Sequence, residues 1–597
     1  MARSPLGRCA LPVAAGLLLV VMTVAAYAPV LHAGFIWDDD AYVTANPTLR
    51  NLDGLRRIWL EPGSIPQYYP LTFTSFWIEY HLWGLRPFGY HLVNIILHAL
   101  NALLVWQVFL RLRVPAAWFA AAVFALHPMH VESVAWVTER KNILSGLLAL
   151  SALLICLRRL AGGSAAATTL TPNPSPKMGE GEPPHSPLPF SERGVGGGGE
   201  KATYLAVYVL FLGALLSKSV TCTLPAVLLI LAWWKGTLNR RTLCRLVPLG
   251  VVGAGMAAMT VWMERHHVGA EGQDWSLSFV ERFLVAGRAL WFYPRTLLWP
   301  HGLTFIYPRW AIDAHAWWQY LFPAAAVAVL ACLYATRRWI GKGPSTATLC
   351  YAGMLLPALG FFNVYPMRYS FVADHFAYLP SLALIALAAA IGAQLVERAG
   401  SASRALSLGG GAAVLLLLGT LTARQCTIYH DLRSLWTDTL SKNPACWMAH
   451  NNLAMLLAGE GHRDEAIAHY QEAVRLKPDF AEAHSNLGVA LVEQGKIEDS
   501  IAQFQDALRW KPDDAQADSN LGNVLQMQGR LAEAVGRYEE ALRLQPTNAD
   551  AHNNLGIALL AQGKRKEAIV HFGEALRLNP NSIQARNNLN NALRPQE

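Results

Sequence analysis

The sequence predicts an all-α protein in which a polytopic bundle of about 11 transmembrane helices is followed by a helical solenoid. Two observations predict the bundle. Hydrophobic residues make up 53% of the chain and charged residues only 15%, whereas a typical soluble domain carries about 25% charged residues. Up to about residue 423, apolar residues also gather in stretches long enough to cross a bilayer. The solenoid is predicted because the chain after residue 430 is polar, Ala-rich and periodic.

The predicted spans follow from the roughly 20 apolar residues that a bilayer requires. Residues 280–300 approach this length but contain Arg282, Arg288, Arg295 and Pro294. We therefore expect this segment to lie along the membrane surface. The predicted spans are residues 11–31, 90–110, 115–134, 142–160, 202–217, 221–235, 246–264, 316–336, 347–363, 379–397 and 405–423.

The basic residues orient this bundle. With these spans, every short basic cluster falls on one side of the membrane, which the positive-inside rule makes the cytoplasm. An additional span at 280–300 would place the later clusters outside. The transmembrane domain, residues 1–430, is thus expected to have a cytoplasmic N-terminus and external loops at 32–89 and 265–315. An odd number of spans also places the repeat domain, residues 431–597, on the external side.

Composition excludes several classes of protein and structure. The formal net charge of +8 comes from short clusters between apolar stretches, not from a basic face with interleaved aromatic residues, so nucleic acid is not an expected partner. The eight cysteines form no Cys-x-x-Cys pair, so neither a zinc site nor a disulfide framework is indicated. Residues 161–201 are rich in Gly, Pro and Ser; they predict a disordered, dispensable cytoplasmic loop.

The repeat domain has a period of 34 residues, which together with its small and aromatic positions is the tetratricopeptide signature. Such repeats stack into a superhelix with a concave groove. Four repeats are predicted at about 447–480, 481–514, 515–548 and 549–582, followed by a terminal helix at 583–593. The prolines that end each repeat are Pro444, Pro478, Pro512, Pro546 and Pro580.

A ladder of asparagines follows the same period on the first helix of each repeat. Stacked amides on a concave face can hydrogen-bond an extended peptide backbone whatever its sequence. The alternative is that these amides are merely solvated. The predicted acceptor-binding residues are Asn452, Asn486, Asn520, Asn554 and Asn588.

Three adjacent acidic residues, Asp38, Asp39 and Asp40, begin the first external loop. One carboxylate can act as a general base while a neighbour orients it or holds a sugar hydroxyl or a metal. The alternative is a solvated acidic turn. We take Asp38 and Asp39 as the candidate catalytic residues.

A second cluster, His127, His130 and Glu132, lies at the predicted outer turn between the spans 115–134 and 142–160. These residue types can bind zinc, but their spacing matches no zinc motif. No metal site is predicted, and binding of a phosphate or hydroxyl is the functional interpretation. A structural role for His127, before Pro128, is an equal alternative.

Charged residues near the outer leaflet complete the candidate donor site. Cations on that side could bind a lipid-linked phosphate, although phospholipid headgroups are the ordinary partner of such residues; they include Arg140, Lys141, Lys218 and Arg288. Asp374, just before the span 379–397, is a further functional candidate, because ionisable groups at such a depth are costly.

Several short motifs, in this order and with the repeats behind them, resemble the transmembrane-and-tetratricopeptide-repeat family of GT-C-like glycosyltransferases. The resemblance covers the chain except residues 161–201. The sequence departs from the family pattern at His375 and Tyr69, where the family usually has Arg. The motifs are Trp37-Asp38-Asp39, Asn46-Pro47, Gly89-Tyr90-His91-Leu92-x-Asn94 with His98, His127-Pro128-x-His130-x-Glu132, Leu216-Ser217-Lys218 with Thr223-Leu224-Pro225, Tyr307-Pro308, and Asp374 with Tyr378-Leu379-Pro380.

The resemblance implies protein O-mannosyltransferase activity with a polyprenyl-phosphate sugar donor, and it assigns the base to Asp38 or Asp39. The acceptor would be a Ser or Thr hydroxyl of a protein held by the repeats. No cofactor is required, and a divalent metal is not indicated. The alternatives are a non-catalytic membrane-anchored scaffold and a glycan or polymer ligase with a sugar acceptor. The expected location is a bacterial inner membrane, with membrane lipid as a further partner.

Overall fold

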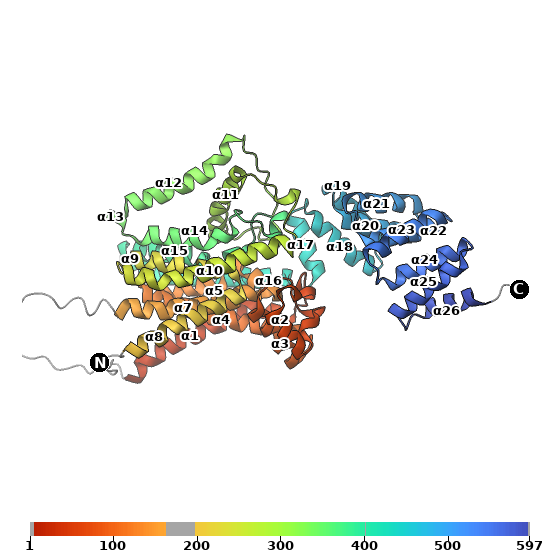
Figure 1. Ribbon diagram of the computed structural model, residues 1–597. Helices are drawn as coiled ribbons and strands as arrows, with labels where there is room; N and C mark the ends of the chain where they lie inside the picture. Colours follow the sequence, from red (N-terminus) through yellow and green to blue (C-terminus); the bar gives the residue numbers. More distant parts are fainter. Residues whose placement is uncertain (1–4, 163–196, 400, 595–597) are drawn as a thin grey trace, which may run out of the picture. The chain divides into compact units, whose positions relative to one another are not determined.

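The computed structural model describes residues 5–162, 197–399 and 401–594. The regular structure of these residues is helical throughout, with no β-strand among them, which confirms the predicted all-α class. Two compact units divide the chain, Met1–Leu435 and Trp436–Glu597 (Figure 1). Apart from its two ends, the predicted loop 161–201 lies outside the described residues.

The first unit is a bundle of long helices that run side by side (Figure 1). Helix α4 packs against α1, α5 and α7, and α7 packs against α8. The helices are α1 (Pro5–Tyr27), α2 (Leu52–Leu60), α3 (Pro70–Trp83), α4 (Pro87–Leu112), α5 (Ala117–Leu126), α6 (Val131–Ala135), α7 (Arg140–Gly162), α8 (Gly197–Ser217), α9 (Leu224–Trp234), α10 (Arg240–His266), α11 (Phe279–Leu298), α12 (Leu321–Ala335), α13 (Arg337–Ile340), α14 (Gly343–Leu355), α15 (Ser381–Arg398) and α16 (Ser401–Ile428); α17 (Leu432–Lys442) follows.

Seven helices among the described residues are long and apolar enough to cross a membrane. Three shorter apolar helices accompany them, at Ala117–Leu126, Ala202–Ser217 and Ser219–Trp234. Helix α11 carries several charged residues and is not one of the seven. The eleven-span topology and its orientation stay predictions. The seven segments are Leu11–His32, Pro87–Leu112, Val137–Arg158, Arg240–His266, Trp317–Ala335, Ser381–Arg398 and Ser407–Ile428.

The prediction of one continuous helix over residues 115–134 is wrong. Helix α5 ends at Leu126, and His127 is extended, with φ −79° and ψ 125°. Pro128 causes this break, because proline disfavours a helical conformation in the residue before it and has no N–H to donate. Three short helices follow and bring polar groups to the end of the bundle: η5 (Pro128–His130), α6 and η6 (Val137–Glu139).

The predicted span 347–363 is also interrupted. Helix α14 ends at Leu355, and the 3₁₀ turn η10 (Leu356–Ala358) contains Pro357 near its start. The chain then continues without a long helix until α15. At this break, as described below, Pro357 forms part of a cavity wall.

The second unit consists of paired helices, two in each predicted repeat. Small residues allow the pairs to approach closely: a Cβ atom added at Gly522 would lie 2.7 Å from the Tyr538 ring. Gly556 faces Phe572 in the same way. The helices are α18 (Trp447–Gly459), α19 (Arg463–Leu476), α20 (Ala481–Glu493), α21 (Ile497–Trp510), α22 (Ala515–Met527), α23 (Leu531–Leu544), α24 (Ala549–Ala561), α25 (Arg565–Leu578) and α26 (Ile583–Leu593).

Candidate functional site

The acidic loop after α1 is fixed to the rest of the bundle by Asp39. This side chain is completely buried. One carboxylate oxygen accepts a hydrogen bond from the Ile36 N–H at 2.9 Å. The other accepts from the N–H and the hydroxyl of Thr138, at 2.8 and 2.7 Å. Because both carboxylate oxygens accept hydrogen bonds from the protein itself, Asp39 attaches the acidic loop to η6.

Asp38 is the accessible member of the pair. Its side chain is half-buried, between the fully buried Asp39 and the exposed Asp40. The residue before it, Trp37, has a φ of +47°, a left-handed conformation that is uncommon for a bulky side chain. A strained residue of this kind is often found where a functional group must be aimed.

Burial raises the pKa of Asp38 to about 6, and the nearby Lys141 ammonium opposes this shift. Burial raises the pKa of Asp39 to about 7, although its hydrogen-bond donors favour the ionised form. A carboxyl group with a pKa near neutrality is suited to accept a proton. Of the two, only Asp38 combines this property with access for a reactant.

A buried charge cluster lies beside Asp38. The Glu139 carboxylate contacts the ammonium groups of both Lys141, at 3.1 Å, and Lys218, at 2.9 Å. All three side chains are less than a tenth exposed. One carboxylate therefore compensates two cations. Burial of uncompensated charge is costly, and the Asp38 and Glu132 carboxyl groups also face these lysines.

Asn142 and His375 extend the cluster toward η12 (Asp374–Ala377). The Asn142 amide donates to Glu139 at 2.6 Å and to the His375 carbonyl at 3.0 Å. Glu132 accepts from the His375 N–H at 2.9 Å and contacts the His375 ring nitrogen Nδ1 at 2.9 Å. Residues from α6, η6, α7 and η12 are thus held together by one hydrogen-bonded network.

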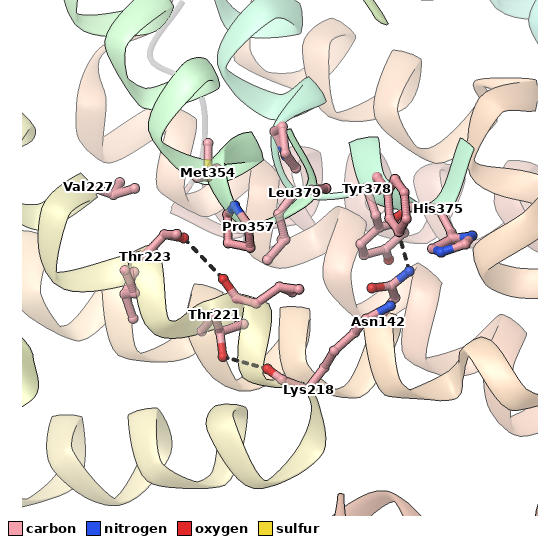
Figure 2. Close-up of a pocket in the computed structure, with 16 residues that line it drawn as sticks. Asn142, Lys218, Thr221, Thr223, Val227, Met354, Pro357, His375, Tyr378 and Leu379 are labelled. Atoms are coloured by element: carbon pink, nitrogen blue, oxygen red, sulfur yellow. Dashed lines mark hydrogen bonds between the residues drawn. The ribbon is translucent and has the colours of Figure 1, made fainter. Parts of the chain in front are cut away.

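A cavity with a volume of about 60 Å³ opens from this network. Figure 2 shows Asn142 and His375 at one end and Val227 at the other. Lys218 lines the cavity from the loop between α8 and η7 (Ser219–Thr223). Most of the remaining wall is apolar. The apolar residues that line it are Ala149, Val220, Leu224, Val227, Met354, Pro357, Ala358, Phe376, Leu379 and Pro380.

Other predicted donor-binding residues are engaged by the protein. The Arg140 guanidinium is fully buried and contacts the carboxylate of Glu79, the Asn94 side chain at 2.6 Å and the Tyr90 carbonyl at 2.8 Å. These contacts favour a structural role for Arg140.

The two predicted histidines also bond within the fold. His127 caps η5 by accepting from the Met129 N–H at 3.2 Å, and its other ring nitrogen lies 2.9 Å from the Leu297 carbonyl. His130 contacts the Phe124 carbonyl at 2.8 Å and the Ser381 hydroxyl at 3.0 Å. This geometry favours the structural interpretation of both residues.

The two remaining predicted donor-site residues are Asp374, which lies next to the network, and Arg288, which packs on an aromatic ring. Asp374 is buried and accepts from the Tyr307 hydroxyl at 2.8 Å; it precedes His375 in the chain. The Arg288 guanidinium lies over the Trp310 ring, 4.4 Å from its centroid. Among the described residues, no group of three or more His, Cys, Asp and Glu side chains is arranged to hold a metal ion.

The asparagine ladder forms contacts between repeats. Asn486 donates to Asn451 at 3.1 Å, and Asn554 donates to Asn523 at 2.9 Å. Amides of the ladder thus bond to neighbouring asparagines one repeat earlier. The remaining contacts are those of Asn588, which donates to Asn553 at 2.9 Å, of Asn520, which accepts from Gln516 at 3.0 Å, and of Asn452, whose buried Nδ2 has no protein partner in the described chain.

Known family models match the helical repeats of the second unit. Residues 513–581 match a model described as tetratricopeptide repeat, residues 460–495 and 490–529 match a TPR repeat model, and residues 447–472 match a further tetratricopeptide repeat model. The repeats are tetratricopeptide repeats. Among solved structures, the crystal structure of MamA is 25% identical, covers 25% of this chain and 86% of its own, and has a TM-score of 0.24.

Curated relatives extend the comparison into the first unit, which is called the membrane unit from here on. Protein O-mannosyl-transferase Tmtc3 of Drosophila melanogaster is 26% identical over 529 residues, covering 78% of this chain and 55% of the relative. Human protein O-mannosyl-transferase TMTC1 is 27% identical, covering 79% and 56%. The chain is similar to TMTC protein O-mannosyl-transferases over most of its length. It spans about half the length of these two relatives.

In this TMTC-like chain, two residues of the charge cluster were missed by motif reasoning. Glu139 and Asn142 were not among the predicted site residues, although Lys141 was named as an outer-leaflet cation and the run Glu139-Arg140-Lys141 is a sequence signal. Three adjacent charges at the start of a predicted span must find partners, because charges in such a segment are costly. The sequence could therefore have identified the run, but not which member faces Lys218.

Proposed function

We propose that this protein is a membrane glycosyltransferase that moves a hexose, most simply mannose, from a polyprenyl phosphate to a Ser or Thr hydroxyl of a protein. One observation carries the proposal: the accessible carboxylate of Asp38 lies beside a buried site in which two lysines share one glutamate, and that site opens into an apolar cavity. The similarity to protein O-mannosyl-transferases supports the choice of sugar and acceptor.

The donor would bind with its phosphate at the lysines and its lipid in the cavity. With Glu139 ionised, Lys141 and Lys218 leave one positive charge without a partner inside the trio, and a phosphate diester supplies one negative charge. Lys218 lines both the cluster and the cavity. The apolar wall offers burial to the isoprenyl units nearest the phosphate, at about 25 cal/mol per Å² of apolar surface.

The chemical step would be a single displacement. The acceptor hydroxyl oxygen attacks the anomeric carbon and forms the new glycosidic bond. The bond from that carbon to the phosphate oxygen breaks, and its electron pair stays on the lipid phosphate. Asp38 takes the hydroxyl proton, a contribution worth roughly 10²–10⁴-fold in rate, while Lys141 and Lys218 stabilise the leaving phosphate. A single displacement inverts the configuration at the anomeric carbon.

The repeat domain would hold the acceptor as an extended segment. The predicted amide ladder supplies donors and acceptors suited to a peptide backbone, and Asn452 has an amide nitrogen with no protein partner in the described chain. Binding the acceptor in a groove raises its local concentration near the transfer site. We further propose an inner-membrane location in a bacterium, with the repeats and the acidic loop both on the periplasmic side.

Transfer in proteoliposomes tests the proposal. The donor is polyprenyl-phosphate mannose, and the acceptor is an unstructured Ser- and Thr-rich peptide library. Asp38→Asn should lower kcat by roughly 10²–10⁴-fold while donor binding persists. Asp40→Asn is the matched control, because Asp40 is the exposed neighbour in the same loop, and it should keep the wild-type rate.

The outcomes separate the candidate functions. Transfer by wild type that is lost in Asp38→Asn supports the enzyme and assigns its base. A wild type that binds peptides but transfers no sugar from any lipid donor would instead support a membrane-anchored scaffold. Transfer to a glycan but to no peptide would support a polymer ligase. A product that retains the anomeric configuration would contradict the single displacement.

A further inference from the structure

Trp136 carries a buried polar group that the proposed mechanism does not use. The residue lies between α6 and η6 and is only 6% exposed. Its indole nitrogen Nε1 is buried and has no hydrogen-bond partner in the described part of the chain. Buried donors are almost always paired, because an unpaired one loses its bonds to water without replacement. Such an N–H is thus a candidate to meet a ligand.

The surroundings of Trp136 connect both halves of the candidate site. The Lys141 ammonium lies 5.9 Å from the centroid of its ring, and the His375 ring centroid is 6.2 Å away. On another side, Trp136 packs edge-to-face on Phe305 at 5.1 Å. Phe305 in turn contacts Trp37, the residue before Asp38, at 6.3 Å. Two contacts therefore join Trp136 to the residue before the proposed base, and one contact joins it to Lys141, a proposed phosphate ligand.

We propose that the Trp136 indole N–H donates a hydrogen bond to a hydroxyl of the transferred hexose and so helps to select a sugar-bearing lipid over the bare lipid phosphate. This inference rests on the proposed function. The reacting sugar must lie between the group that takes the acceptor proton and the cations that hold the leaving phosphate, and Trp136 contacts Lys141 on one side and, through Phe305, the residue before Asp38 on the other.

The sugar is favoured over the phosphate as the partner of this N–H. Two ammonium groups are already at hand for a phosphate, and they are stronger partners for an anion than a neutral indole. Aromatic side chains also present apolar faces to the C–H groups of a pyranose, and Trp136 and Phe305 provide such faces beside the N–H. A neutral N–H donor on an aromatic ring matches a sugar hydroxyl.

Equilibrium binding to the purified full-length protein tests this assignment with two probes, polyprenyl-phosphate mannose and sugar-free polyprenyl phosphate. Trp136→Phe keeps the apolar ring but removes the N–H. It should weaken binding of the mannosyl lipid by about tenfold, the effect of one hydrogen bond, and leave binding of the sugar-free lipid unchanged. Unchanged affinity for the mannosyl lipid, or an equal loss for both lipids, would overturn the assignment.

The chain offers a matched control. Trp83, at the end of α3, also has a buried indole nitrogen without a protein partner in the described residues, and its ring packs on Tyr90. Trp83→Phe should bind both lipids like wild type; a loss equal to that of Trp136→Phe would contradict the proposal. Should wild type bind neither lipid, the proposed function itself would fall, and this inference with it.

Discussion

Glu139→Gln is the most informative perturbation of the charge cluster. In the wild type, one carboxylate that is 1% exposed contacts two ammonium groups whose side chains are also less than a tenth exposed. The neutral amide keeps the size of the side chain but removes the carboxylate that both Lys141 and Lys218 contact. Removing one partner of a buried ion pair costs about 3–5 kcal/mol. We therefore expect the free energy of unfolding of the membrane unit to fall by about this amount.

Lys218→Met provides the comparison. It removes one cation but leaves Glu139 paired with Lys141 at 3.1 Å, so it should destabilise the protein less than Glu139→Gln. The double variant Glu139→Gln with Lys218→Met contains a single unpaired ammonium in place of two. It should therefore be more stable than the sum of the two changes predicts, with a coupling energy of about 1–3 kcal/mol.

Thermal and denaturant unfolding of the four proteins in one detergent measures these differences. The expected order of stability is wild type first, then Lys218→Met, with Glu139→Gln below it and partly rescued in the double variant. A Glu139→Gln protein as stable as wild type, or strictly additive effects, would refute the reasoning that the carboxylate compensates both lysines. Addition of a polyprenyl phosphate should stabilise the wild type more than Lys218→Met, because ligand binding to the folded state adds stability.

Two further predictions concern activity and acceptor binding. Transfer should follow a bell-shaped pH profile. The rate rises as Asp38 loses its proton, because burial raises the pKa of this residue to about 6. It falls as Lys218 loses its charge, because burial lowers the pKa of this residue to about 8. In Asp38→Glu the acid limb should shift, and a flat profile between pH 5 and 9 would contradict both roles. Asn452→Ala should weaken acceptor-peptide binding in an anisotropy assay by about tenfold without lowering Tm, and undiminished affinity would make this amide irrelevant to the acceptor.

Sequence patterns predicted the fold class because each pattern reports a local physical constraint. The 34-residue period and its small residues specify helix pairs, and Gly522 against the Tyr538 ring is the contact that this spacing implies. Apolar stretches of sufficient length likewise predicted membrane helices. The error at residues 115–134 had a local cause that the sequence also contains, namely Pro128, whose effect on His127 was outweighed by the hydropathy of the segment.

The site was less predictable because its partners are distant in the sequence. The sequence predicted that Arg140 and Lys218 were equivalent cations near the outer leaflet. Only the fold shows that Arg140 is buried against Glu79 while Lys218 meets Glu139. The same holds for Asp38 and Asp39, which the sequence leaves equivalent. Their difference arises from Thr138, which lies 99 residues from Asp39 and engages one carboxylate oxygen.

One turn of the chain sets both halves of the proposed site. Thr138 holds Asp39 and so positions the loop that carries Asp38. The next residue, Glu139, holds Lys218, and Lys141, the second residue of α7, contacts Glu139 as well. The residues that hold the base loop and the phosphate ligands are therefore neighbours in the chain, within residues 138–141, and they reach Asp39 and Lys218 through hydrogen bonds and an ion pair. A rigid link of this kind suits a single displacement, in which base, anomeric carbon and leaving group must be in place together.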